Sequence, residues 1–281
     1  MSEDVDEVGW AIEPGDEMAP MIEVVGGVIK FHREAAGMSV ADFGDAMRYG
    51  EDLIRKVERG ARIPRVEFLY SADELVNARG AIVAMRKYVE DAQYPKKVRK
   101  LKESEARAVE MLLYSNHHIH GLLQTPEYAT AMFENRLPAL SRNVMEREVG
   151  ARMARKSVFD QDPAPALSFV QEQVTIERPL GGTGVLRGQL EHLLEVGELK
   201  NVSLQVMPTF REEHAGMHGQ MEVLKFHDGT AVGRSDGAFN GRPVSTPREL
   251  RILELRYGMI RTQALPPRES LAFIEQALGA L

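Results

Sequence analysis

Between residues 24 and 94, apolar residues recur every three or four positions, and no run alternates between apolar and polar residues as a strand would. The pattern predicts five short helices separated by polar or Gly-containing turns. The apolar face of the first helix, which stops at Gly37, consists of Val24, Val28, Phe31 and Ala35. The core-facing residues expected in the next three helices are Val40, Phe43, Gly44 and Met47, then Leu53, Ile54 and Val57, and then Phe68, Leu69, Ala72, Leu75 and Val76. A fifth helix is expected from Ala81 to Gln93.

The second and third predicted helices are joined by a tight turn, Arg48-Tyr49-Gly50. Ser39 is positioned to cap the second helix, and the third ends at Gly60. Two short helices joined in this way can place the second of them in the major groove of DNA, where Arg and Lys side chains contact base edges and phosphates. The candidate DNA-binding residues are Ser39, Arg48, Arg55, Lys56, Arg59 and Arg62.

A basic segment, residues 95–103, follows with five positive charges between Lys96 and Lys102, and it is the predicted linker between two domains. It could contact phosphates or serve as a solvated hinge. Beyond it, strand and helix patterns are mixed. Strands are expected at 106–114, 167–171, 202–207, 220–226 and 231–233, and helices at 126–135, 142–160, 185–199, 248–264 and 268–281. The predicted fold class is therefore multidomain: an all-α helix-turn-helix domain at 24–94, followed by an α+β (mixed α/β) domain at 104–281.

The distribution of charge changes what is expected of the N-terminal residues and of DNA binding. Residues 1–23 contain eight acidic residues and no Lys or Arg, which predicts a disordered acidic arm. Residues 24–75 contain eight Lys or Arg and nine acidic residues, a net charge of −1, and Glu51 and Asp52 would repel phosphates near the third helix. DNA binding by this segment is therefore expected to be weak or selective.

The composition indicates a cytoplasmic globular protein. A chain of 281 residues is expected to form two domains. It has no cysteine, which excludes disulfides and fits a reducing compartment. Residues 1–23 lack the basic leader and apolar run of a signal peptide or membrane anchor. We therefore expect a cytoplasmic location and no membrane partner.

Residues 24 to 76 resemble the Xre/Cro-type helix-turn-helix family. The resemblance is carried by Val57-Glu58-Arg59-Gly60-Ala61-Arg62-Ile63-Pro64, which arrives in register with the cap and core positions Ser39, Phe43 and Met47. It implies that residues 51 to 59 enter the groove of DNA. The chain departs from the family at the turn, where Arg48 stands in place of the usual Gly and Gly50 in place of the usual Ser or Thr cap.

Residues from about 100 to 281 resemble the domain of unknown function that follows an Xre-type helix-turn-helix in a large actinobacterial, antitoxin-like regulator family. Six blocks carry the resemblance in order: Gly121 to Ala129, Ala151 to Arg155, Phe169 to Glu172, Gln189 to Leu194, Val202 to Pro208 and His214 to Gly216. His120 stands where the family usually has Pro. The resemblance implies a small partner protein encoded nearby. We also expect the protein to bind operator DNA as a homodimer.

Few residues of the C-terminal part point to chemistry. Arg152 and Arg155 lie three positions apart, and either could form a partly buried pair with Glu172. Two groups of histidines are candidate metal ligands: His117, His118 and His120, and the pair His214 and His218. Adjacent histidines on an extended segment point apart, which argues against a shared metal ion. Walker, Gly-x-Ser-x-Gly, His-Glu-x-x-His and EF-hand motifs are absent. We therefore expect no catalytic residues, no cofactor and no metal.

These observations predict a sequence-specific DNA-binding transcriptional regulator in which the C-terminal domain mediates dimerisation and docks a small partner protein. The terminal helices offer apolar stripes for such docking, although core packing is the commoner use of such stripes. The stripe residues are Leu250, Leu253, Met259 and Ile260 in one helix and Leu271, Ile274 and Leu278 in the other. Two alternatives remain open: an interaction protein of a paired toxin-antitoxin-like system that has little or no DNA binding, and a regulator that senses a small molecule.

Overall fold

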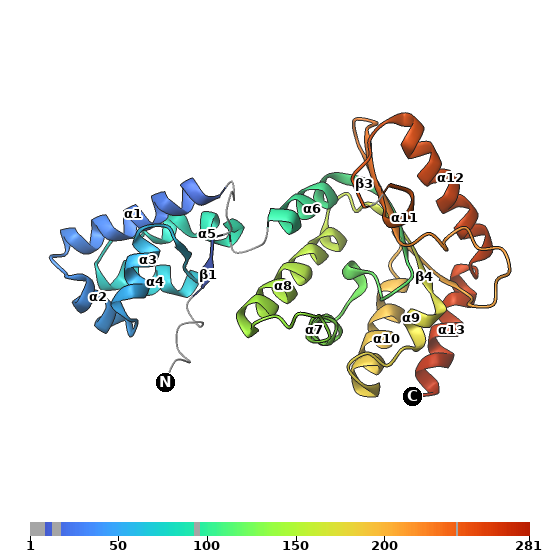
Figure 1. Ribbon diagram of the computed structural model, residues 1–281, viewed down its shortest axis with the longest axis horizontal. Helices are drawn as coiled ribbons and strands as arrows, with labels where there is room; N and C mark the ends of the chain where they lie inside the picture. Colours follow the sequence, from blue (N-terminus) through green and yellow to red (C-terminus); the bar gives the residue numbers. More distant parts are fainter. Residues whose placement is uncertain (1–8, 13–17, 93–95, 240) are drawn as a thin grey trace. The chain divides into compact units, whose positions relative to one another are not determined.

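The computed structural model describes residues 9–12, 18–92, 96–239 and 241–281 (Figure 1). The chain divides into two compact units. The first contains residues 1–100 and 140–151, and the second contains residues 101–139 and 152–281. The division after residue 100 lies within the basic segment 95–103. The sequence pattern did not predict that residues 140–151 belong to the first unit.

The described residues of the first unit form helices and one short pair of strands. Its helices are α1 (Ala19–Ala35), α2 (Val40–Met47), α3 (Glu51–Glu58), α4 (Val66–Leu75) and α5 (Arg86–Ala92), with a 3-10 turn, η1 (Val83–Met85), before α5. Strand β1 (Trp10–Ala11) pairs antiparallel with β2 (Arg62–Ile63). Phe43, Ile54 and Phe68 are fully buried, so the predicted inner faces of α2, α3 and α4 form the core except at Leu75, which is 37% exposed at the end of α4.

The predicted inner face of the first helix is wrong except at Val28, which is partly buried against the core. Val24 and Phe31 are 53% and 66% exposed, and the buried residues of α1 are instead Ile22, Val25 and Ile29. The helix carries two apolar stripes, and tertiary contact selects the one that includes Gly26. A Cβ atom at Gly26 would overlap the carbonyl oxygen of Val57, which shows how closely this side of α1 approaches the end of α3.

The predicted disordered arm is also wrong for the part of it that the structure describes, residues 9–12 and 18–23. Trp10 and Ile12 pack against the core of the first unit, and α1 already begins at Ala19. The prediction rested on the acidic composition of the segment and gave little weight to its few apolar residues. Burial of these residues is sufficient to order the segment against the first unit. Residues 1–8 and 13–17 lie outside the described residues.

The basic segment is helical rather than an irregular linker. Helix α6 spans Lys96–Arg107, so most of the predicted linker belongs to a regular element. Lys, Leu, Glu and Ala are strong helix formers, and their propensity explains why the segment continues as a helix into the second unit. Residues 93–95 lie outside the described part of the chain.

The second unit is built on a mixed five-stranded sheet of order β5-β4-β3-β6-β7. Its strands are β3 (Ala108–Ser115), β4 (Ala166–Glu172), β5 (Val202–Met207), β6 (Met221–Phe226) and β7 (Ala231–Ser235). Strands β3, β4 and β5 are parallel, whereas β6 and β7 join antiparallel beside β3. The mixed α/β class predicted for this part of the chain is confirmed.

Helices pack against both faces of the sheet. The helical segments of this unit are η2 (Gly121–Leu123), α7 (Pro126–Glu134), η3 (Arg155–Asp160), α9 (Gln173–Glu177), α10 (Thr183–Gly197), α11 (Asp236–Phe239), α12 (Pro247–Gln263) and α13 (Pro267–Gly279). Helix α8 (Arg142–Ala154) belongs to the first unit as far as residue 151. Leu190 of α10 and Ile274 of α13 lie in the core on one face, and Leu253 and Ile260 of α12 lie in the core on the other. Among the described residues, no helix is long and apolar enough to cross a bilayer.

The apolar stripes predicted for docking are therefore mostly core. Of the stripe residues, Met259 is 49% exposed, whereas Leu253, Ile260 and Ile274 are buried. The outer face of α12 presents a different set, Ile252 and Leu255 together with Met259. Packing against the sheet accounts for the stripes that periodicity had offered for a partner.

Candidate nucleic-acid interface

Helices α2 and α3 are held in place by local chemistry that the sequence specifies. The Ser39 hydroxyl accepts a hydrogen bond from the Asp42 backbone N–H at 3.1 Å, and the Asp42 carboxylate accepts one from the Ser39 backbone N–H at 3.3 Å, which completes a capping box. Helix α2 ends at Arg48, which adopts the left-handed conformation with φ 61°. Gly50 then occupies the N-cap of α3 without a side-chain bond. The Ser39 side chain is thus already engaged as a cap in the free protein.

Helix α3 presents its basic residues on the side away from the core. Ile54 and Val57 are buried, whereas Arg55 and Lys56 have side chains that are 58% and 40% exposed. Each cation is paired with an acid one turn earlier: Arg55 with Glu51 and Lys56 with Asp52, both at 2.6 Å. The hydrogen bond from Lys56 lowers the pKa of Asp52. The two central cations are therefore partly neutralised by their own helix.

The other predicted DNA contacts have different surroundings. Arg59 is exposed at the end of α3, where its Nε donates to the Arg55 carbonyl at 3.1 Å. Arg62 lies on β2 and donates to the Gly9 carbonyl at 2.8 Å, so it takes part in holding β1. The structure thus brings Arg55, Lys56 and Arg59 together on α3 and directs Arg62 toward the N-terminal strand.

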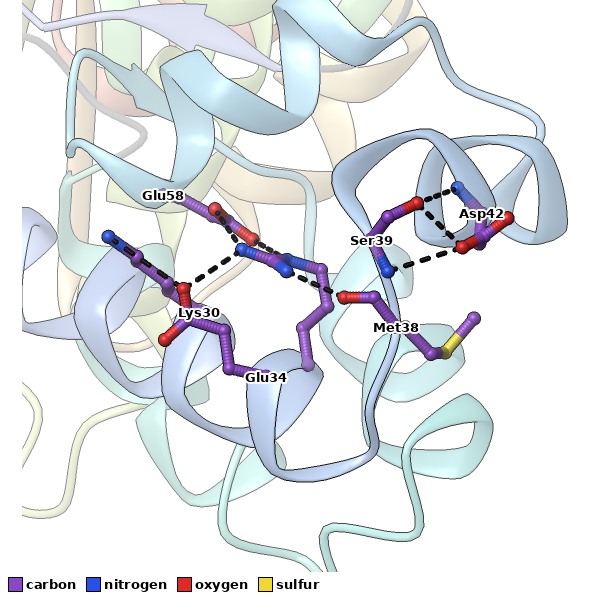
Figure 2. Close-up of polar contacts among 7 residues, drawn as sticks. Lys30, Glu34, Met38, Ser39, Asp42 and Glu58 are labelled. Atoms are coloured by element: carbon purple, nitrogen blue, oxygen red, sulfur yellow. Dashed lines mark hydrogen bonds and ion pairs between the residues drawn. The ribbon is translucent and has the colours of Figure 1, made fainter.

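A buried ion pair, missed in the sequence analysis, links the end of α1 to the end of α3 (Figure 2). The Arg33 guanidinium donates to Glu58 twice, through Nε at 2.6 Å and through a terminal nitrogen at 3.0 Å. It also donates to the Met38 carbonyl at 2.7 Å, and the Glu34 carboxylate lies 3.5 Å away. Both side chains of the pair are only 6% exposed. This pair fixes the C-terminal end of the helix that carries the candidate contacts.

The stretch Val57 to Pro64 is explained by packing. Its Glu58 is the partner of Arg33. Its Gly60 has φ 69°, in the left-handed region, and a Cβ atom there would lie 2.6 Å from the Cα of Glu23 in α1. Glu58 and Gly60, which carry part of the resemblance, therefore hold α1 against the end of α3.

In the second unit, the predicted pairing of Arg152 or Arg155 with Glu172 is wrong. Arg155 forms a bidentate buried pair with Glu105 of α6, and Arg152 donates to the Gln124 side chain at 2.8 Å. Helical spacing placed the two arginines near each other correctly, but it could not identify partners that are distant in sequence.

Glu172 instead belongs to a cluster with Tyr114 and His214. Its Oε1 accepts from the Tyr114 hydroxyl at 2.7 Å and from His214 Nε2 at 2.6 Å. The Gly216 N–H donates to His214 Nδ1 at 2.9 Å, which assigns the ring proton to Nε2. Burial, with the Glu172 contact adding to it, raises the pKa of Tyr114. The block His214 to Gly216 therefore attaches a loop to the carboxyl end of β4.

The other histidines have structural contacts of their own. His120 is partly buried beside Phe169 and accepts a hydrogen bond from the Leu122 N–H at 3.3 Å, and desolvation lowers its pKa. His118 Nδ1 lies 2.9 Å from the Ile119 carbonyl. Within the described ranges, no three His, Asp or Glu side chains are grouped so as to hold a metal ion.

Glu222 lies near the buried pair of Arg155 and Glu105, and its ionised form is disfavoured. Burial raises its pKa, an effect that Arg234 at 3.8 Å opposes only in part. The native state therefore binds more protons than the unfolded state between the ordinary value near 4.5 and the raised value, so stability falls as pH rises through that window. We expect Glu222→Gln to match the wild type at acid pH and to be more stable at pH 7.5. Hydrogen exchange of β6 at both pH values is the measurement, and a variant that is less stable at pH 7.5 would contradict the assignment.

Comparison with known families identifies the C-terminal part of the chain. Residues 98–276 match the family described as a domain of unknown function, DUF5753. The match covers more than half of the chain and includes the whole mixed sheet and the helices on both of its faces, ending within α13. Comparisons with curated proteins and with solved structures give no match. On the strength of residues 98–276, this chain belongs to the DUF5753 family.

Proposed function

We propose that the protein is a sequence-specific DNA-binding transcriptional regulator of the cytoplasm in which α2 and α3 form an Xre-type helix-turn-helix. The observation that carries the proposal is the exposed row of Arg55, Lys56 and Arg59 on α3, whose opposite side is buried. A recognition helix requires this division, because one side must pack and the other must reach base edges and phosphates. The resemblance of residues 24 to 76 to the Xre/Cro-type family supports the same reading.

The test is binding of the full chain to DNA from its own upstream region, with a shuffled duplex as competitor. We expect Arg55→Ala combined with Lys56→Ala to weaken specific binding by roughly tenfold or more, since a base-contacting Arg contributes about 1–3 kcal/mol. The matched control is Lys30→Ala combined with Lys87→Ala, which removes two exposed cations from α1 and α5 of the same unit. If the α3 variant binds as tightly as the control, α3 is not the recognition helix.

The acids of α3 give a second prediction, with the opposite sign. Glu51 and Asp52 pair with the two cations that DNA would have to engage, and they carry negative charge toward the phosphates. We expect Glu51→Gln combined with Asp52→Asn to raise DNA affinity and to steepen its salt dependence. Titrations at several salt concentrations measure both quantities. An affinity that falls, in a variant whose fold is intact, would mean that the acids position the cations for binding.

In the proposed regulator, the DUF5753 domain receives the signal. It mediates dimerisation and docks a small partner protein encoded nearby, and the exposed residues Ile252, Leu255 and Met259 of α12 are a surface suited to docking. Co-expression of the full chain with each adjacent small gene product, followed by co-purification, tests this part. Substitution of Leu255 by Asp is expected to abolish co-purification, and retention of the partner would place docking elsewhere.

A second input is favoured by a specific observation. A cavity of about 330 Å³ lies among α9, α10 and α13, lined by Ile176, Leu186, Phe273 and Ala277. A mostly apolar pocket of this size suits a small molecule, so the domain is a candidate small-molecule sensor. A metabolite that changes DNA affinity in the absence of any partner would favour this alternative over protein docking.

A further inference from the structure

Lys156 and His192 form an unusual pair in the second unit. Lys156 lies on η3, and its Nζ is 2.8 Å from Nε2 of His192 on α10. His192 Nδ1 lies 3.5 Å from a carboxylate oxygen of Glu195, three residues further along α10. Because the Glu195 carboxylate accepts hydrogen bonds, it favours the tautomer with the ring proton on Nδ1, which leaves Nε2 as the acceptor facing Lys156. The three groups therefore stand in the order amine, base and orienting carboxylate.

The environment weakens the affinity of the Lys156 amine for its proton. Lys30, Lys56 and Lys225 each pair with a carboxylate, whereas Lys156, within the described part of the chain, has an imidazole as its partner instead. Burial lowers the pKa of Lys156, and the acidic groups facing the pair are the exposed carboxylates of Glu127 on α7 and Glu195 on α10. Burial lowers the pKa of His192 as well, with the neighbouring lysine charge adding to the effect, so the imidazole is available as a proton acceptor.

We propose that Lys156 is a covalent modification site, whose amine accepts an acyl group from an activated acyl donor while His192 serves as the base. The donor class is an acyl phosphate or an acyl thioester, both of which carry a carbonyl carbon bonded to a good leaving group. Lys156 is only partly buried, so its amine can be reached from solvent.

The reaction balances with the groups present and the donor named. The lone pair of Nζ forms a bond to the acyl carbon, and the bond from that carbon to the phosphate oxygen or thioester sulfur breaks with its electrons on the leaving group. One proton passes from Nζ to His192 Nε2 and then to water, and Glu195 stabilises the imidazolium through Nδ1. The product is a neutral amide at Lys156.

The test uses the full chain with acetyl phosphate in one arm and acetyl-CoA in the other. Mass spectrometry of peptides follows acetylation at Lys156 and, in the same molecule, at the exposed reference residues Lys87 and Lys200. We expect Lys156 to react on the order of tenfold faster than either reference in at least one arm. This rate enhancement is smaller than the one that a general base typically provides in an enzyme, about 10²–10⁴-fold. The arm that reacts identifies the donor.

Variants separate base catalysis from simple accessibility. His192→Gln is expected to reduce the Lys156 rate to that of the references without changing the references themselves, and Glu195→Gln to reduce it partially. Hydrogen exchange of α10 establishes that each variant is folded, and His192→Asn serves as a second test if the Gln variant is not. Equal rates at Lys156 and the references with both donors would overturn the proposal, as would an unchanged Lys156 rate in a folded His192 variant.

Discussion

Replacement of Glu58 by glutamine is expected to destabilise the first unit by about 3–5 kcal/mol. The substitution leaves the Arg33 guanidinium buried without a counter-charge, because its nearest remaining carboxylate, Glu34, is 3.5 Å away and 56% exposed. Trp10 is the single tryptophan of the chain and packs against the core of this unit. Its fluorescence during chemical denaturation therefore reports on the first unit specifically.

Two controls accompany this experiment. Glu34→Gln removes the exposed carboxylate near the same guanidinium and is expected to cost well under 1 kcal/mol. The combined variant Arg33→Met, Glu58→Leu removes both charges and should recover most of the loss, since a buried ion pair contributes little beyond an apolar replacement. Equal losses in the Glu58 and Glu34 variants would show that the buried pair does not hold α1 to α3.

A loss of the same size, about 3–5 kcal/mol, is expected in the second unit for Glu105→Gln. Glu105 is 3% exposed and forms both hydrogen bonds of the bidentate pair with Arg155. Glu222 also acts on Arg155, but burial raises the pKa of this carboxyl. Removing the charge of Glu105 leaves an arginine uncompensated beside the sheet. Hydrogen exchange of β3 and β4 under mildly denaturing conditions measures the change.

The matched control is Glu103→Gln, an exposed acid on the same helix, α6, which is expected to leave exchange in the sheet unchanged. If Glu105→Gln also leaves exchange in β3 and β4 unchanged, the pair is not a structural link between α6 and η3.

Periodicity predicted the elements more successfully than their partners. The inner faces of α2, α3 and α4 follow from apolar spacing, because each helix has one dominant apolar stripe. The strands of the mixed sheet follow from short apolar runs. Helix α1 has two stripes about one position apart, and the choice between Val24 with Phe31 and Val25 with Ile29 depends on the close approach at Gly26, which spacing does not encode. The small apolar set around Trp10 was likewise hidden by the acids that surround it.

In the candidate site too, local contacts could be predicted from the sequence, whereas contacts between distant residues could not. The outward position of Arg55 and Lys56 follows from helix geometry, and so does their pairing with acids one turn earlier. The buried pair of Arg33 and Glu58 joins residues 25 apart, and the pair of Arg155 and Glu105 joins residues 50 apart. One sequence read alone contains no local signal that distinguishes these charged residues from solvated ones, so only the folded arrangement reveals them.

The return of residues 140–151 to the first unit has a consequence for limited proteolysis. The polypeptide passes between the two units three times, after residues 100, 139 and 151. A single cut after residue 100 therefore leaves part of the first unit covalently attached to the C-terminal fragment. Fragments that begin at the start of the DUF5753 match, residue 98, carry this segment without the helices with which it is grouped. Chain cleavage and physical separation of the units should thus be distinct events, detectable as a nicked protein that still elutes as one species under native conditions.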